Sequence, residues 1–205
     1  MSFITLIKEK LVDLWIHGPR LTNTMNYNHM YDKYISTNTA YQDRIYSIGK
    51  KLKEAISHDD IINIYDDIYK GYRSDPIYGL IDWSPSITTV IVKEKDDCDG
   101  MAVTWSYLAN KFFSIRDIKI KSIKTYCFVN FGWIWNISQS HVMCVVDTND
   151  GLYLFDYKTI RKFDSFDQIR LYFKNYYASK AKIENIIIRE IPIPISPKED
   201  LLNKI

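Results

Sequence analysis

Hydrophobic residues in the first third of the chain recur every three to four positions, a spacing that predicts helices. The first stripe ends at the helix-breaking pair Gly18-Pro19, and a second stripe predicts one helix from about Met30 to Ile56. A third helix is predicted to open near Asp59-Asp60, because acidic residues favour a helix N-terminus. Residues 1–72 are therefore expected to form a helical region, either as a subdomain or as the wall of one domain with residues 73–205.

A loop segment follows, with a short β-branched run, ITTVIV, before the pattern becomes helical again at Cys98. The stripe that predicts this helix consists of Met101, Ala102, Trp105, Leu108, Ala109 and Phe112. The period then changes to two, which predicts strands at about 118–121, 124–131, 141–147 and 152–157. A helix opening near Asp164 and a strand at about 185–193 complete an α+β architecture.

The composition is that of a globular protein of one domain, with 205 residues, 46% of them hydrophobic and 15% aromatic. The formal net charge of +2 is too small to favour nucleic acid or an acidic membrane as a partner. No apolar run is long enough for a transmembrane helix, and charged residues interrupt the N-terminal segment where a signal peptide needs its apolar core. The three cysteines lack CxxC spacing, so a reducing cytoplasm is expected.

One cysteine lies among three aspartates at the start of the central helix, in the stretch KEKDDCDGMA. Cys98 has three interpretations: a nucleophile, a metal ligand, or a small residue in a helix cap. A helix N-terminus lowers the pKa of a thiol, whereas the carboxylates of Asp96, Asp97 and Asp99 raise it. Zinc sites use two or more thiolates or imidazoles at short spacing, which this run lacks, so no metal and no cofactor are expected. Asp97 is predicted to cap the helix.

His141 is the histidine best placed to act as a base for this cysteine. His17 and His58 are predicted at helix C-termini and His29 in a polar linker, positions that are typical of structural or solvent-exposed histidines. His141 instead opens the apolar strand HVMCVV, where an imidazole without a partner would cost free energy. A partner for its ring is therefore expected nearby.

Strand pairing predicts which carboxylate that partner is. If the two strands joined by the Asn149-Asp150-Gly151 turn enclose an even number of loop residues, His141 and Asp156 project from the same face. A four-residue loop would set Asp156 opposite Met143, within side-chain reach of His141, whereas a two-residue Asp150-Gly151 turn would separate them by a further step. The chain then supplies the parts of a Cys-His-Asp triad. The alternative is a buried thiol, an edge histidine and a hairpin aspartate without a joint role.

Three segments resemble the motifs of the transglutaminase-like superfamily, especially its microbial transglutaminase-like cysteine proteases. They are DDCDGMA at Asp96–Ala102, SHVMCVV at Ser140–Val146 and LFDY at Leu154–Tyr157. The cysteine and the histidine are 43 residues apart and the aspartate follows after a further 15, intervals similar to those of the family. One feature departs from the family pattern, because Lys95-Asp96 replaces the glycine that usually precedes the Asp-Cys pair.

The resemblance implies a papain/transglutaminase-like core, in which the helix that carries the nucleophile packs on an antiparallel sheet. The catalytic residues that it implies are Cys98 as nucleophile, His141 as general base and acid, and Asp156 as the residue that orients the imidazole. By analogy with the family, Trp83 would flank the oxyanion. Asp99 and Trp135 are further candidates for the substrate side, although the alternation Phe131, Trp133 and Trp135 is equally typical of a half-buried strand.

Together these observations predict a cysteine hydrolase that cleaves peptide or isopeptide bonds of a protein or peptide substrate through an acyl-enzyme thioester. Two alternatives stay open. One is a protein-glutamine transferase or deamidase, and the other is a non-catalytic binding or structural protein that retains the fold. The abundance of Tyr, Ile, Lys and Asn is consistent with an AT-rich genome, such as that of a phage or a low-GC microbe.

Overall fold

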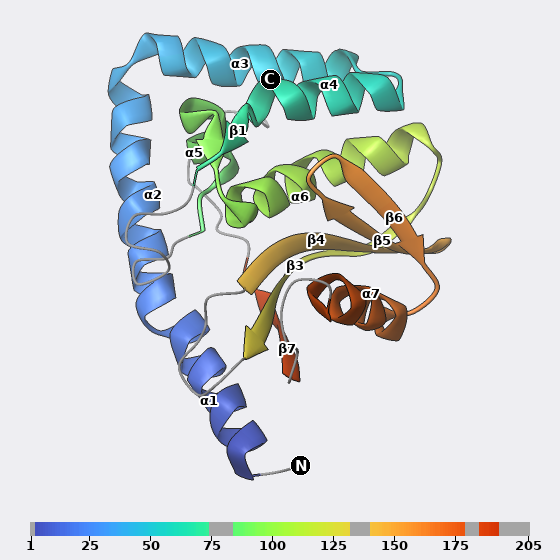
Figure 1. Cartoon of the computed structure of the whole chain (residues 1–205). Coiled ribbons are helices and arrows are strands. Elements are labelled where there is room, and N and C mark those ends of the chain that lie inside the picture. The colour runs from blue at the N-terminus through green and yellow to red at the C-terminus, as the bar shows by residue number, and fades with distance from the viewer. Residues whose placement is uncertain (1–2, 74–83, 132–139, 179–184, 193–205) are drawn as a thin grey trace.

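The computed structural model of the protein describes residues 3–73, 84–131, 140–178 and 185–192 (Figure 1). The helices of the N-terminal third are α1 (Phe3–His17), α2 (Pro19–Thr37), α3 (Thr39–Glu54) and α4 (His58–Ile68). The first two form a column along one side of the molecule, and α3 and α4 lie side by side across its top. The predicted break at Gly18 is confirmed, and only glycine fits there because a Cβ would lie 2.6 Å from the Leu14 carbonyl oxygen.

The second predicted helix is interrupted. Instead of one helix from Met30 to Ile56, the chain forms α2 and α3 with a break at Asn38. Asn38 has an extended backbone, and its side chain accepts a hydrogen bond from the Ala40 N–H (3.0 Å), which caps α3. The prediction of a single helix was wrong because the apolar stripe runs on across this residue.

Two histidines also lie elsewhere than predicted. His58 begins α4 instead of ending the preceding helix, because Ser57 and Asp60 form a capping box at that point. His29 lies within α2 and not in a linker. His17 ends α1, as predicted.

The β-branched run before the central helix is itself helical. This helix, α5 (Ile87–Lys93), begins after Ser86, whose hydroxyl accepts a hydrogen bond from the Thr89 N–H (3.3 Å). It ends at Glu94, which has a left-handed backbone (φ 61°). Most of its side chains are buried, so packing overrides the low helix propensity of Ile, Thr and Val. Two short strands flank it in sequence and pair in parallel, β1 (Gly71–Tyr72) and β2 (Lys95–Asp96).

The central helix is α6 (Cys98–Ile115), and all six residues of its predicted stripe are buried. Its largest side chain, Trp105, stacks on Tyr65 of α4 with ring centroids 4.7 Å apart. On its other side the Trp105 ring lies 4.9 Å from the ring of Phe155 in the sheet. The central helix therefore joins the N-terminal helices to the sheet.

One antiparallel sheet holds five strands in the order β6-β5-β4-β3-β7. They are β3 (Ile120–Phe131), β4 (Ser140–Thr148), β5 (Gly151–Asp156), β6 (Thr159–Phe163) and β7 (Asn185–Ile191). The first two predicted strands are one continuous strand, β3, and β6 was not predicted. A two-residue turn, Asn149-Asp150, joins β4 to β5 and is followed by Gly151 with φ 132°. The helix α7 (Phe166–Ala178) begins close to its predicted start.

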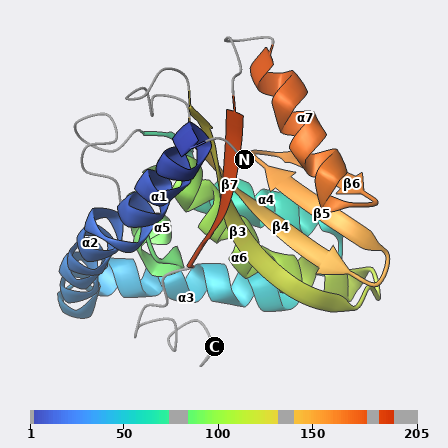
Figure 2. The ribbon, with the colours of Figure 1, turned by 90° about the horizontal axis from the view of Figure 1, so that it is seen from below.

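Helices α6 and α7 cover opposite faces of the sheet (Figures 1 and 2). Alternate residues of β4 face the two sides, with Val142, Cys144 and Val146 in the α6 cluster and Met143 and Val145 in the α7 cluster. The α6 cluster also contains buried residues from α1, α2, α3 and α4, so these helices share its core. The architecture is α+β, as predicted. None of the described helices is long and apolar enough to span a bilayer.

Candidate active site

Cys98 is the first residue of α6, and the helix brings its thiol to the beginning of β4. The backbone N–H of Val142 donates a hydrogen bond to the Cys98 sulfur. Asp97 caps the helix as predicted, since its side chain accepts a hydrogen bond from the Asp99 N–H (3.1 Å). The thiol is half-buried, and it lies next to the peptide that links Val142 to His141.

His141 contacts Asp156 across strands β4 and β5, with Nε2 of the ring 3.0 Å from Oδ1 of the carboxylate. Asp147 pairs with Leu152, which is the register that the four-residue loop Thr148–Gly151 would give. The turn itself is shorter, because Thr148 also pairs with Gly151 and only Asn149 and Asp150 remain between the strands. Continuing that register sets Asp156 opposite Met143, one diagonal step from His141. The predicted pairing of the imidazole with this carboxylate is therefore confirmed.

This contact engages Nε2 of His141, and the second ring nitrogen is Nδ1. Nδ1 is the nitrogen nearer the backbone, and the backbone N–H of the next residue is the group that donates to the Cys98 sulfur. The ring of Tyr157 stacks along the imidazole at a centroid distance of 6.0 Å. The structure thus pairs the imidazole with the carboxylate and sets the thiol against the backbone N–H of the residue after His141.

The helix that carries Cys98 also holds the chain that follows Asp156. Tyr157 has a left-handed backbone (φ 50°), and its N–H donates to the Met101 sulfur (2.7 Å). Its carbonyl accepts a hydrogen bond from the Trp105 indole N–H (2.6 Å). One rigid helix therefore fixes both the position of the thiol and the end of the strand that carries the carboxylate.

The loop that precedes α6 is built around Asp96, a fully buried residue. One carboxylate oxygen of Asp96 pairs with Lys93 Nζ (2.8 Å) and the other accepts a hydrogen bond from the Asp97 N–H (2.9 Å). Gly100 leaves room for this side chain, because a Cβ at Gly100 would lie 2.9 Å from Asp96 Cγ and closer still to its Cβ. Gly100 thus supplies the space for Asp96, and the turn of the loop is made at Glu94, which has a left-handed backbone.

The chain that follows α4 holds the same loop by backbone hydrogen bonds. The Lys70 N–H donates to the Glu94 carbonyl (2.6 Å) and the Arg73 N–H donates to the Asp96 carbonyl (2.9 Å). From α3, the Arg44 guanidinium forms an ion pair with Glu94 at 2.7 Å. The N-terminal helical region is thus in direct contact with the loop that precedes Cys98.

Asp99 was expected on the substrate side, but it is only 2% exposed. Its carboxylate accepts a hydrogen bond from the Ser84 hydroxyl (3.1 Å). Ser84 is held by α2, because its N–H donates to Thr24 Oγ1 (2.8 Å) and its carbonyl accepts from Asn28 Nδ2 (3.0 Å). We therefore interpret Asp99 as a structural residue that links α6 to α2 through Ser84, and not as the expected substrate contact.

The environment of the thiol favours its protonated form. Burial, followed by the negative charges of Asp99 and Asp97, raises the pKa of Cys98 well above its ordinary value. The hydrogen bond from the Val142 N–H acts in the opposite direction but does not outweigh them. At neutral pH the resting site therefore contains a thiol and not a thiolate.

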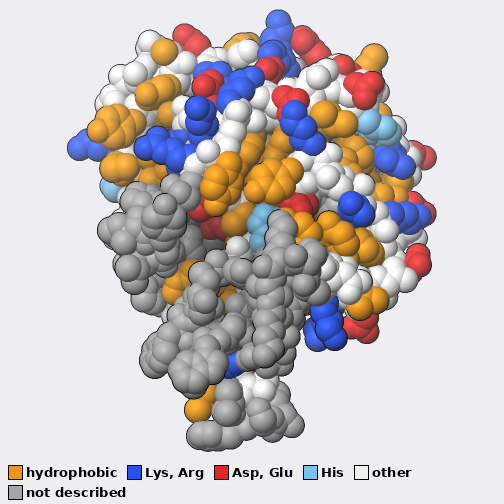
Figure 3. All heavy atoms as spheres, viewed as in Figure 1, with side chains coloured by type: hydrophobic (Ala, Val, Ile, Leu, Met, Phe, Trp, Pro, Cys, Tyr) orange, Lys and Arg blue, Asp and Glu red, His pale blue; other side chains and the backbone are white. Residues whose placement is uncertain are grey.

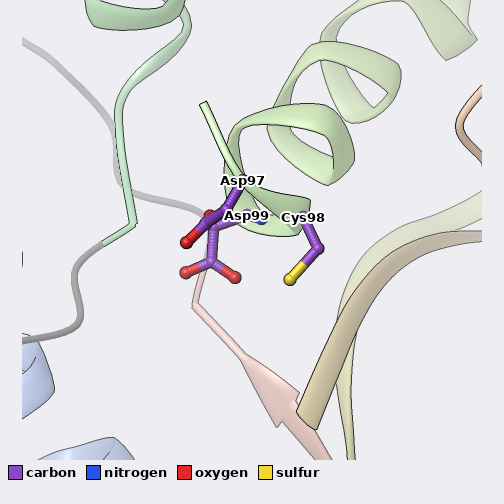
Figure 4. A group of neighbouring side chains, drawn as sticks. All are labelled: Asp97, Cys98 and Asp99. Carbon is purple, nitrogen blue, oxygen red and sulfur yellow. Dashed lines mark hydrogen bonds between the residues drawn. The ribbon is translucent and has the colours of Figure 1, made fainter. Parts of the chain in front are cut away.

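Asp97, Cys98 and Asp99 form a compact group at the start of α6, with candidate ligand atoms within 4.8 Å of one another (Figure 4). In Figure 4 the thiol points toward the strands of the sheet, and the two carboxylates lie on the other side of the helix start. Both carboxylates accept hydrogen bonds, Asp97 from a backbone N–H and Asp99 from Ser84. The group serves as a helix cap and an internal contact, and we assign no metal to it.

Two of the residues implied by the resemblance, Trp83 and Trp135, lie outside the described part of the chain, and all such residues are grey in Figure 3. The other two cysteines, Cys127 and Cys144, are fully buried in the sheet. Sequence reasoning missed the supporting residues, above all Arg44 and Ser84. No local sequence pattern predicts such residues, because their contacts are with residues far away in the sequence. The hydrogen bonds of Ser84, for example, join residues 15 and 60 positions apart.

No protein-family model and no curated protein matches this chain. The interpretation of the site therefore depends on its geometry and on the chemistry of Cys98, His141 and Asp156.

Proposed function

We propose that the protein is a cysteine hydrolase of the transglutaminase-like type, which cleaves amide bonds of proteins or peptides through an acyl-enzyme thioester. The observation that carries the proposal is the 3.0 Å contact of His141 with Asp156, beside a thiol that the next backbone N–H contacts. A structural role alone does not require a thiol at a helix start next to an imidazole oriented by a carboxylate.

The first chemical step follows from these positions. The Cys98 sulfur attacks the carbonyl carbon while Nδ1 of His141 takes the thiol proton, and the carbonyl oxygen becomes an oxyanion. The Cys98 N–H, at the start of the helix, is a donor for that oxyanion. Asp156 stabilises the imidazolium through the Nε2 contact. Collapse of the intermediate breaks the C–N bond, and the imidazolium gives its proton to the leaving amine.

The second step returns the enzyme to its resting state. Water attacks the thioester carbon, His141 removes a proton from the water, and the imidazolium then protonates the departing Cys98 sulfur. If an amine replaces water, the same thioester yields a transferred acyl group. The choice of acceptor therefore separates a hydrolase from a transferase, because both share the first step.

The arrangement of elements supports the same proposal. Helix α6 packs on an antiparallel sheet with the thiol at its first residue, which is the arrangement that a papain/transglutaminase-like core requires. The three cysteines are free thiols, in keeping with the reducing cytoplasm that we propose as the site of action.

The proposal is tested with 4-nitrophenyl acetate, an activated ester that acylates reactive thiols without a specific binding site. Mass spectrometry should find the acetyl group on Cys98, Cys98→Ala should stay unmodified, and His141→Ala should be acylated at least about 100-fold more slowly. Acylation that is unaffected by His141→Ala would favour a non-catalytic binding protein. A second reaction with a fluorescent primary amine, read on a protein substrate such as casein, distinguishes transfer from cleavage.

A further inference from the structure

Tyr69, the residue that ends α4, reaches the peptide groups immediately before the nucleophile. Its hydroxyl lies 2.5 Å from the carbonyl oxygen of Asp96 and 3.0 Å from the carbonyl oxygen of Asp97. A phenol can donate only one hydrogen, so these two successive carbonyls share it, and the contact with the Asp96 carbonyl is the shorter one. The side chain is 8% exposed, so water does not replace it readily.

The two carbonyls differ in their other donors. The Asp96 carbonyl also accepts from the Arg73 N–H at 2.9 Å. The Asp97 carbonyl accepts from the Met101 N–H, the first hydrogen bond of the helix, at 3.3 Å. Because that bond is long, Tyr69 is the closer of the two partners that hold the Asp97 carbonyl.

The Asp97 carbonyl belongs to the same peptide group as the Cys98 N–H. In a planar trans peptide the C=O and the N–H point in opposite directions, so a group that holds one of them also fixes the other. The Tyr69 hydroxyl, on the carbonyl side, therefore directs the Cys98 N–H away from α4. This N–H belongs to the first turn of the helix, where backbone donors have no acceptor within the helix.

The surroundings of Tyr69 keep it in place and protonated. Its N–H donates to the Tyr65 carbonyl (2.8 Å), and its ring stacks on the Tyr65 ring at 5.7 Å, which in turn stacks on Trp105 of α6. Burial, then the neighbouring Tyr65 and Asp96, raises the pKa of Tyr69. The hydroxyl is therefore protonated, and a donor, at neutral pH.

We propose that Tyr69 is a positioning residue for the oxyanion site: by holding the Asp97 carbonyl it aims the Cys98 N–H at the oxygen of the tetrahedral intermediate. The inference rests on the proposed function, because only an acyl-transfer reaction forms such an oxyanion. It gives the N-terminal helical region a part in catalysis, since Tyr69 ends one of its helices.

Tyr69→Phe tests the inference, because it removes the hydroxyl and keeps the stacked ring. Two reactions of the same thiol are compared: acylation by 4-nitrophenyl acetate, which passes through an oxyanion, and alkylation by iodoacetamide, which does not. We expect the second-order rate constant of acylation to fall by about 10-fold to 100-fold. Alkylation should stay within about twofold of the wild type, which also shows that the site is folded.

Tyr65→Phe is the matched control, since the Tyr65 hydroxyl is buried and has no hydrogen-bond partner among the described residues. It should leave the ratio of the two rates unchanged. If Tyr69→Phe slows acylation and alkylation equally, Tyr69 has only a structural role and the inference is wrong. If acylation by Tyr69→Phe is as fast as in the wild type, the inference is also wrong, but the proposed function stands. Wild-type protein that alkylates at Cys98 but is never acylated there would instead overturn the proposed function, and the inference with it.

Discussion

Nε2 of His141 lies 3.0 Å from Oδ1 of Asp156, and the two side chains are only 13% and 15% exposed. This contact joins neighbouring strands of one hairpin, whereas the thiol beside it comes from a helix on the sheet. The carboxylate favours a proton on Nε2 of the ring, and under the proposed function the other nitrogen, Nδ1, would act on the thiol.

Substitutions of Asp156 should show this orienting role in a graded way. Asp156→Ala removes the acceptor and should slow Cys98 acylation by about 10²-fold to 10⁴-fold, the range of general acid–base catalysis. Asp156→Asn keeps a side-chain oxygen that can accept from Nε2 and should lose less. The rate of acetylation by 4-nitrophenyl acetate is the measurement. Asp147→Asn, on the same hairpin, is the control, and an equal loss from the Asn and Ala variants of Asp156 would contradict the explanation.

The pH dependence of Cys98 alkylation should follow its raised pKa. Because the thiol is the stable form at neutral pH, the iodoacetamide rate should rise with pH by about 10-fold per unit up to that pKa. Asp97→Asn removes a negative charge but keeps a good helix cap, so it should lower the pKa and speed alkylation at pH 7. Asp59→Asn, in the first turn of α4, should leave the profile unchanged. A plateau extending to acidic pH in the wild type would indicate a preformed thiolate–imidazolium pair instead.

Gly100→Ala should destabilise the protein by about 1–3 kcal/mol, because the new methyl group collides with the buried Asp96 side chain. Urea denaturation measures the change. In a double-mutant cycle, Asp96→Gly should relieve the collision, so the double variant should be less destabilised than the sum of the single variants by about 0.5 kcal/mol or more. Additive losses would show that the helix start moves to accommodate the methyl group without contacting residue 96.

Asn28→Ala should destabilise the protein by about 1–3 kcal/mol, because it strips hydrogen bonds from a buried site. The Asn28 amide donates to the Ser84 carbonyl (3.0 Å) and accepts from the Ser86 N–H (2.8 Å). Asn26→Ala is the matched control, since Asn26 is exposed on the same helix and should change the free energy of unfolding little. A similar loss from both variants would point to a change in the helix itself.

The sequence predicted those parts of the fold and of the site that depend on local periodicity. The stripe from Met101 to Phe112, the cap at Asp97 and the parity of His141 with Asp156 all follow from fixed helix and strand geometry, and all agree with the structure. The helix α5 was not predicted, because its β-branched residues have a low helix propensity. It forms because it is buried against the rest of the fold, and the local sequence does not reveal that burial.

Contacts between distant segments were the part that the sequence could not supply. Tyr69, Ser84 and Asn28 are ordinary residues in their local context, and their importance comes from partners 15 to 61 positions away. The interruption at Asn38 was also hidden, because the apolar stripe continues on both sides of it. An asparagine can cap a helix or lie within one, and only the packing of α2 and α3 decides between them.

The two-residue Asn149-Asp150 turn gives the site an order of assembly. A hairpin closes over a short loop at little entropic cost and forms within microseconds, so the imidazole and its carboxylate can meet while much of the chain is still unfolded. The thiol reaches them only when α6 docks on the sheet, and its helix start is complete only when α2 and α4 are in place. We therefore expect the pair of His141 and Asp156 to form early in folding and Cys98 to reach it last.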